Sequence, residues 1–158
     1  MGLRVADALV ISVLAGIVCL VSLPRLADYV RSSNEEDARL ALGLLGPAFF
    51  PEGATVPAGD LTDLGAWSGT LRHRLRDARP LEDASALLYH GYLFSLRSMG
   101  GETWLVAWPR EGGRTGVGVF AWSPTRGALR AEALQRERWM GVAGAGEDLA
   151  DAGWAPLD

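Results

Sequence analysis

The longest apolar pattern in the chain lies close to its N-terminus. No charged residue occurs from Ala8 to Leu23, a run of Leu, Val, Ile, Ala and Gly interrupted only by Ser and Cys. At about 1.5 Å per residue, a helix over residues 5–23 would be roughly 28 Å long, enough to cross the hydrocarbon core of a membrane. We therefore predict a membrane-spanning helix over residues 3–23.

The helical pattern continues beyond this segment with a different character. Apolar residues recur at three- and four-residue spacings, so one stripe can pack on a domain: Leu26, Tyr29, Val30, Ala38, Ala41, Leu44 and Leu45. Pro24 lacks an N–H and should leave the carbonyl of Leu20 unpaired. It is therefore predicted to kink the helix rather than end it. Gly46 and Pro47 predict the end of the helix.

Charged residues recur along the second half of this helix. Arg31, Glu35 and Arg39 lie four residues apart, a spacing that allows ion pairs along one face. Two interpretations stay open. The residues form an ordinary solvated face, or they pair one subunit with another in a filament.

Residues 48–69 are rich in Gly, Pro and Thr and are predicted to form a long loop. Leu71, Leu75 and Ala78 share a helical face among several Arg residues, which predicts a short basic helix ending before Pro80. That basic surface could touch anionic headgroups or an acidic partner.

Strand patterns dominate the second half of the chain. We predict strands over Leu88–Arg97, Thr103–Trp108, Val117–Ser123 and Leu129–Leu134, with a two-residue turn at Gly100 and Gly101. The tail from Arg138 to Asp158 is glycine-rich and should be mostly irregular, with Trp139 and Trp154 attaching it to the domain. Three or four antiparallel strands with one face on the helical stripe predict an α+β fold.

Composition and motifs limit the kinds of partner and reaction that the sequence predicts. The formal net charge is −4, which argues against a nucleic-acid partner, since that would need a basic surface. We find no P-loop, no Gly-x-Ser-x-Gly and no dinucleotide-binding glycine fingerprint. His73 and His90 are the only histidines, and Cys19 lies in the apolar run, so a zinc site is not expected. We expect neither catalytic activity nor a required cofactor.

One acidic cluster could bind a metal. Glu147, Asp148 and Asp151 lie close together in the glycine-rich tail, and hard oxygen ligands at close spacing can hold calcium. The alternative is a set of solvated acids, because the spacing fits no calcium-loop motif.

The N-terminal pattern resembles the first helix of type IV pilins and pseudopilins. The resemblance is carried by Gly2 before Leu3, by Asp7 five residues into the mature chain, and by Pro24 within the run Leu23–Arg31. A long helix followed by strands also resembles the pilin headpiece, more weakly. Because Cys19 is the single cysteine, the chain cannot close the C-terminal disulfide loop of many pilins. That difference favours pseudopilins or minor pilin-like proteins.

The resemblance implies a function and a set of sites. A prepilin peptidase would cut between Gly2 and Leu3, and Asp7 would pair with the α-amine of Leu3 in the neighbouring subunit. Residues 1–2 would be a short leader, residues 3–24 the transmembrane half of the helix, and residues 25–158 an α+β pilin-like headpiece. The protein would lie in the bacterial inner membrane as a single-pass protein with a periplasmic or extracellular headpiece. Its partners would be lipid, other pilin-like subunits, the peptidase and the inner-membrane assembly machinery of a pilus or type II secretion system.

Two alternatives remain at this point. Asp7 could simply reach the cytoplasmic headgroups, paired with Arg4, in a monomeric single-pass protein whose extracytoplasmic domain binds a partner or ligand. Residues 1–23 could also be a secretory signal peptide. That interpretation is disfavoured because no basic region precedes the apolar run and the helical pattern continues through Pro24.

Overall fold

The computed structural model describes residues 5–99, 101–131, 141 and 153–157. The chain divides into two compact units, Met1–Val30 and Arg31–Asp158. Helix α1 (Val5–Phe49) contributes to both of them. The prediction of one long N-terminal helix is confirmed, and α1 runs without a break through Pro24. The predicted kink at Pro24 stays a prediction.

The first unit consists of the apolar half of α1. Every described side chain from Ala8 to Val30 is exposed, and Leu20 reaches 75% exposure. By length and composition this helix could cross a membrane. A large apolar surface with no protein around it is rare on soluble monomers and is typical of a segment that contacts a membrane or another protein.

The prediction that the helix ends at Leu45, before Gly46 and Pro47, was wrong by four residues. The helix continues through Gly46 and Pro47 to Phe49, and the amide of Phe50 still donates to the carbonyl of Gly46 at 2.9 Å. The last turn is retained because Phe49 and Phe50 are both buried in the core. Burial of two aromatic side chains outweighs the local breaking tendency of a Gly-Pro pair.

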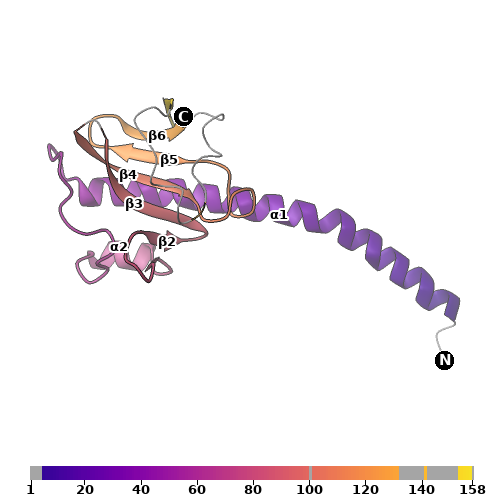
Figure 1. The fold of residues 1–158 in the computed structure, drawn as a ribbon. Helices are drawn as coiled ribbons and strands as arrows, with labels where there is room; N and C mark the ends of the chain where they lie inside the picture. Colours follow the sequence, from indigo (N-terminus) through magenta and orange to yellow (C-terminus); the bar gives the residue numbers. More distant parts are fainter. Residues whose placement is uncertain (1–4, 100, 132–140, 142–152, 158) are drawn as a thin grey trace. The chain divides into compact units, whose positions relative to one another are not determined.

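The second unit contains a sheet of seven strands in sequence order, with every neighbouring pair antiparallel (Figure 1). The strands are β1 (Arg79–Pro80), β2 (Leu87–Tyr89), β3 (Tyr92–Met99), β4 (Glu102–Pro109), β5 (Phe120–Ser123), β6 (Gly127–Ala131) and β7 (Trp154–Pro156). The α+β class predicted from sequence is consistent with this architecture. The two outermost strands, β1 and β7, each contain a proline.

Several elements differ from their predictions: β1 was not predicted, and the predicted strand Val117–Ser123 begins only at Phe120. The predicted strand Leu88–Arg97 is two strands, because His90 (φ 43°) and Gly91 (φ 78°) form a tight turn between β2 and β3. Positive φ at both turn positions is the geometry that joins short hairpins. The basic helix α2 (Gly69–Arg74) is shorter than predicted and ends before Ala78. β7 was not predicted, since the tail was expected to be irregular.

Both faces of the sheet are covered. One face packs on the second half of α1, which crosses behind the strands in Figure 1, and on the loop and α2. This cluster includes Ala38, Leu42, Leu45, Phe94 and Phe120. The opposite face buries a second cluster that includes Leu88, Leu93, Trp104, Val106, Trp108 and Val119. Because α1 supplies one wall of the larger core, its second half is part of the domain and not a linker.

The backbone of α1 approaches the sheet closely at Gly46. A methyl group built on Gly46 would lie 2.6 Å from Cγ of Trp122, well inside contact distance. The indole of Trp122 in turn packs on Phe50, with ring centroids 5.2 Å apart. Glycine at residue 46 therefore lets the helix backbone rest directly on an aromatic side chain of β5.

This contact gives a stability prediction with a matched control. Gly46→Ala should destabilise the protein by about 1–3 kcal/mol, because Trp122 must move or the helix must shift. Gly43→Ala, one turn earlier with nothing within 4 Å of the new methyl group, should stabilise it by about 0.5–1 kcal/mol through helix propensity alone. Denaturant unfolding of the full-length protein in detergent measures both. Equal effects of the two substitutions would contradict the packing described here.

Candidate functional site

The residues that the sequence singled out for processing and assembly lie mostly outside the described part of the chain. Gly2 and Leu3 precede it, and Asp7 lies on α1 with a side chain that is not described. The proposed calcium ligands Glu147, Asp148 and Asp151, like Trp139, also lie outside it. Those predictions stay predictions. Within the described residues, no group of three acidic, His or Cys side chains could hold a metal ion.

A polar seam, defined as Arg31, Asn34 and Glu35, joins α1 to the loop between β4 and β5. Arg31 Nη1 donates to the carbonyl of Gly113 at 3.4 Å, and Asn34 Nδ2 donates to the carbonyl of Thr115 at 3.0 Å. Two polar residues about one turn apart on the helix thus bind two nearby carbonyls of a loop more than eighty residues later in the chain.

Glu35 makes the strongest contacts of the polar seam. Its Oε1 accepts hydrogen bonds from the amides of Val117 at 2.8 Å and Gly118 at 3.0 Å. Both amides precede β5, and their hydrogen bonds to Glu35 are partly buried. The carboxylate therefore provides an acceptor for two backbone donors that strand pairing leaves without one. Hydrogen bonds to a charged acceptor are worth about 1.5–3 kcal/mol each.

The polar seam also corrects the interpretation of the charged run as a freely solvated face. Glu35 and Asn34 are half-buried against the sheet unit rather than pointing into solvent. Arg39 lies 3.9 Å from Glu36 and places its guanidinium 5.1 Å from the centre of the Phe120 ring. Sequence spacing suggested that Glu35 pairs with Arg31 and Arg39 along the helix, whereas Glu35 binds backbone amides before β5 and Arg39 lies near Glu36 instead.

A second polar cluster surrounds His90 in the β2–β3 turn. His90 Nδ1 lies 2.7 Å from Asp37 Oδ2 on α1, and Nε2 lies 3.7 Å from Asp77 Oδ2 after α2. The imidazole stacks on the Tyr89 ring at 4.1 Å with an interplanar angle of 10°. His90 therefore connects three elements that are distant in sequence.

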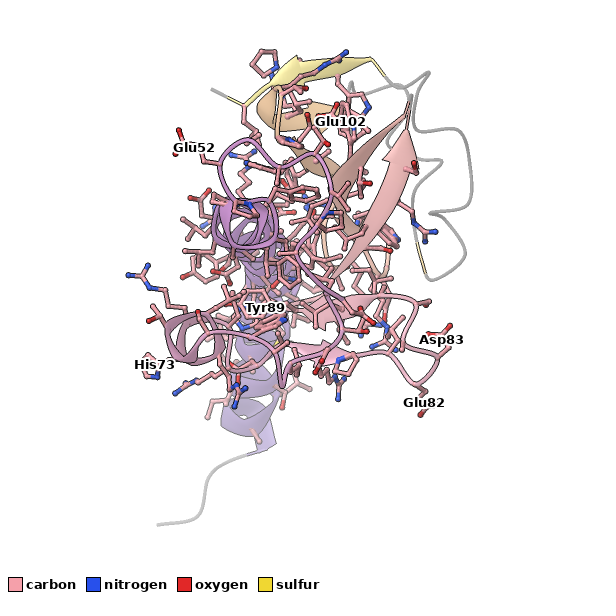
Figure 2. All side chains as sticks on the ribbon, turned by 90° about the vertical axis from the view of Figure 1, so that its left-hand side faces the viewer. Glu52, His73, Glu82, Asp83, Tyr89 and Glu102 are labelled. Carbon is pink, nitrogen blue, oxygen red and sulfur yellow. The ribbon has the colours of Figure 1, made fainter. Side chains whose placement is uncertain are left out.

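Tyr89 stays a neutral phenol in this cluster. Partial burial raises the pKa of Tyr89, the carboxylates of Asp37 and Asp77 raise it further, and Arg76 acts in the opposite direction. A neutral tyrosine can present its ring to an apolar surface without bringing a charge. Figure 2 shows Tyr89 beside α1 in the middle of the headpiece.

Next to this cluster an open groove of about 560 Å³ runs along α1. α1 supplies Asp37, Leu40, Ala41 and Leu44 to its wall and floor, and the opposite wall comes from Arg74 and Leu75 at the end of α2 and from Tyr89. The lining is mainly apolar, with Arg74 exposed at the rim. Such a groove can accept an apolar group with a polar or charged group beside it.

The position of α2 at one wall of the groove has a local cause. Ser68 caps the helix, accepting a hydrogen bond from the amide of Leu71 at 3.3 Å. Leu71 and Leu75 are both buried in the core, and Arg72 holds the preceding loop by donating to the carbonyls of Leu64 and Gly65, each at 2.9 Å. The basic side chains of α2 are left on the outside.

Sequence reasoning missed both the polar seam and the groove. His90 carried a usable signal, since a histidine before glycine between two apolar runs is compatible with a turn. Glu35 carried none, because its partners are backbone amides that any sequence would provide.

Comparison of the chain with known protein families, characterised proteins and solved structures finds no match.

The polar seam can be tested with a neighbouring residue as control. Glu35→Ala should lower the free energy of unfolding by about 2–3 kcal/mol, because two amides lose a charged acceptor. Glu36→Ala removes only an exposed 3.9 Å pair with Arg39 and should cost at most about 0.5 kcal/mol. Chemical denaturation of the two full-length variants compares them. A Glu35 variant as stable as the Glu36 variant would exclude the anchoring role of this carboxylate.

Proposed function

We propose that this protein is a membrane-anchored structural subunit of a type IV pilus, a pseudopilus or a related filament, without catalytic activity. The observation that carries the proposal is that the two parts of α1 have different surroundings. Its first part, Ala8–Val30, exposes every described side chain, while Ala38, Leu42 and Leu45 are completely buried in the headpiece. A single helix that serves as anchor and as core element couples a membrane to a globular surface.

The features at the N-terminus support the same proposal. Gly2 before Leu3 and the acid at residue 7 have the spacing of a pilin-like processing and assembly signal. In this proposal Asp7 of one subunit meets the α-amine of Leu3 in the next, so that two charges unfavourable in lipid neutralise each other. The peptidase, the assembly machinery of the inner membrane and further pilin-like subunits are the partners, and the headpiece is periplasmic or extracellular.

A second candidate function is favoured by the groove beside α1. A monomeric single-pass protein could use that groove to bind a partner or ligand outside the membrane. The two candidates differ in whether the membrane helix makes contacts between copies.

Substitution of Asp7 separates these candidates. Asp7→Ala should still insert into the membrane, because it removes a charge whose insertion costs up to about 3 kcal/mol. It should nevertheless lose incorporation into filaments, while Asp7→Glu, which keeps the charge, should retain most of it. The measurement is the amount of each variant in sheared or cross-linked filaments at equal membrane levels. A plain anchor predicts that Asp7→Ala behaves as wild type.

Processing gives an independent test. Protein taken from membranes that contain a prepilin peptidase should lack Met1 and Gly2 and carry a methyl group on the amine of Leu3. Intact mass spectrometry reads this directly, and Gly2→Ala or a larger substitution at residue 2 serves as the comparison. A mass that retains both residues would contradict the processing proposed here.

A further inference from the structure

The groove beside α1 has an open, apolar surface. Leu40 is 59% exposed, and a methyl group added at Gly43 would meet nothing within 4 Å. Leu75 is buried at the base of the facing wall. Arg74 stands exposed at the rim and has no ion pair among the described residues. A matching partner would therefore present an apolar side chain with an acid beside it.

The same chain carries such a feature in the loop after α1. We call residues 51–57 the knob. Val56 is 70% exposed, and outside α1 it is the one large apolar side chain that the described residues leave exposed. Glu52, four residues earlier, is also exposed and forms no ion pair among the described residues. Figure 2 shows Glu52 pointing outward, away from Tyr89, which lines the groove of the same copy.

The knob is held in shape before any partner binds. The amide of Ala58 donates to the carbonyl of Phe49 at 2.7 Å and closes the loop at its base. Within it, the amide of Ala54 donates to the carbonyl of Pro51 at 2.8 Å, with Gly53 at φ 79° in the turn. A loop already fixed by its own hydrogen bonds loses little conformational entropy when it docks.

Local charge complementarity favours a second copy of the chain as the partner that occupies the groove. The chain has a formal net charge of −4, so two copies repel each other unless opposite charges meet locally. The region of α2 offers such a site, since Arg72, His73, Arg74 and Arg76 are all exposed. The loop that contains the knob carries Glu52, Asp60 and Asp63 and no basic residue.

We infer that the knob of one copy docks in the groove of the next, with Val56 on Leu40 and Leu44 and with Glu52 beside Arg74. The inference rests on the proposed assembly of copies and names one of its contacts outside the membrane. Knob and groove are different surfaces of the same chain, so the contact is head-to-tail. Contacts of that kind continue from copy to copy unless the rotation closes a ring.

The test uses full-length protein in membranes with Cys19 replaced by alanine. Two differently tagged copies are produced together, one carrying Val56→Cys and the other Leu40→Cys, and oxidised mildly. We expect a disulfide-linked dimer that contains both tags, at least five times more abundant than with Ser98→Cys as the partner of Val56→Cys. Ser98 is exposed on β3 and serves as the matched control. Equal yields for the two partners would overturn the inference.

Charge reversal provides the second arm. In this cysteine pair, Glu52→Arg or Arg74→Glu alone should lower the yield of the mixed dimer at least threefold, and the two together should restore at least half of it. No recovery in the double variant, with both copies at normal membrane levels, would also overturn the inference.

The results separate this contact from the proposed function. Filaments that form without the Val56–Leu40 link would reject the knob and groove and leave assembly standing. A strong link in copies that form no filament would support the contact and reject the filament.

Discussion

The structure depends on the burial of α1 against one face of the sheet. Ala38, Leu42 and Leu45 have no exposed surface, and they meet aromatic and aliphatic side chains from β3, β4 and β5. Burying a large aliphatic side chain is worth about 1.5–3 kcal/mol. These apolar contacts taken together therefore outweigh any single polar interaction in the domain. A short antiparallel sheet with one uncovered apolar face would not be stable in water.

Polar contacts then fix how the helix lies on that apolar surface. Burial alone does not set a rotation or a register, because apolar contacts have no direction. Glu35 does so by accepting from two adjacent amides, and Asp37 does so by meeting His90 at 2.7 Å. These contacts lie on either side of the buried stripe, so together they oppose rotation of the helix in either direction.

Much of this fold could be predicted from the sequence, and what was missed has physical causes. The periodicity of α1 was interpreted correctly only in part: Ala38, Ala41 and Leu45 are buried as predicted. Leu26, Tyr29 and Val30 of the predicted stripe are exposed, and Leu42, which the stripe omitted, is fully buried. The turn at His90 and Gly91 was missed because two short strands with a similar apolar content read as one. β7 was missed because it pairs with β6 across more than twenty residues, and local patterns carry no information about such pairing. The polar seam and the groove depend on contacts between distant segments in the same way.

The prolines of the outer strands limit how the domain can associate. Pro80 on β1 and Pro156 on β7 are exposed and offer no amide to an approaching strand. Unprotected sheet edges are templates for amyloid-like growth, and natural proteins commonly block them with proline and with short edge strands. Such protection matters most where copies of a protein meet at high local density. The sheet can therefore be crowded against its neighbours without fusing with them, which leaves side-chain surfaces to decide which copies meet.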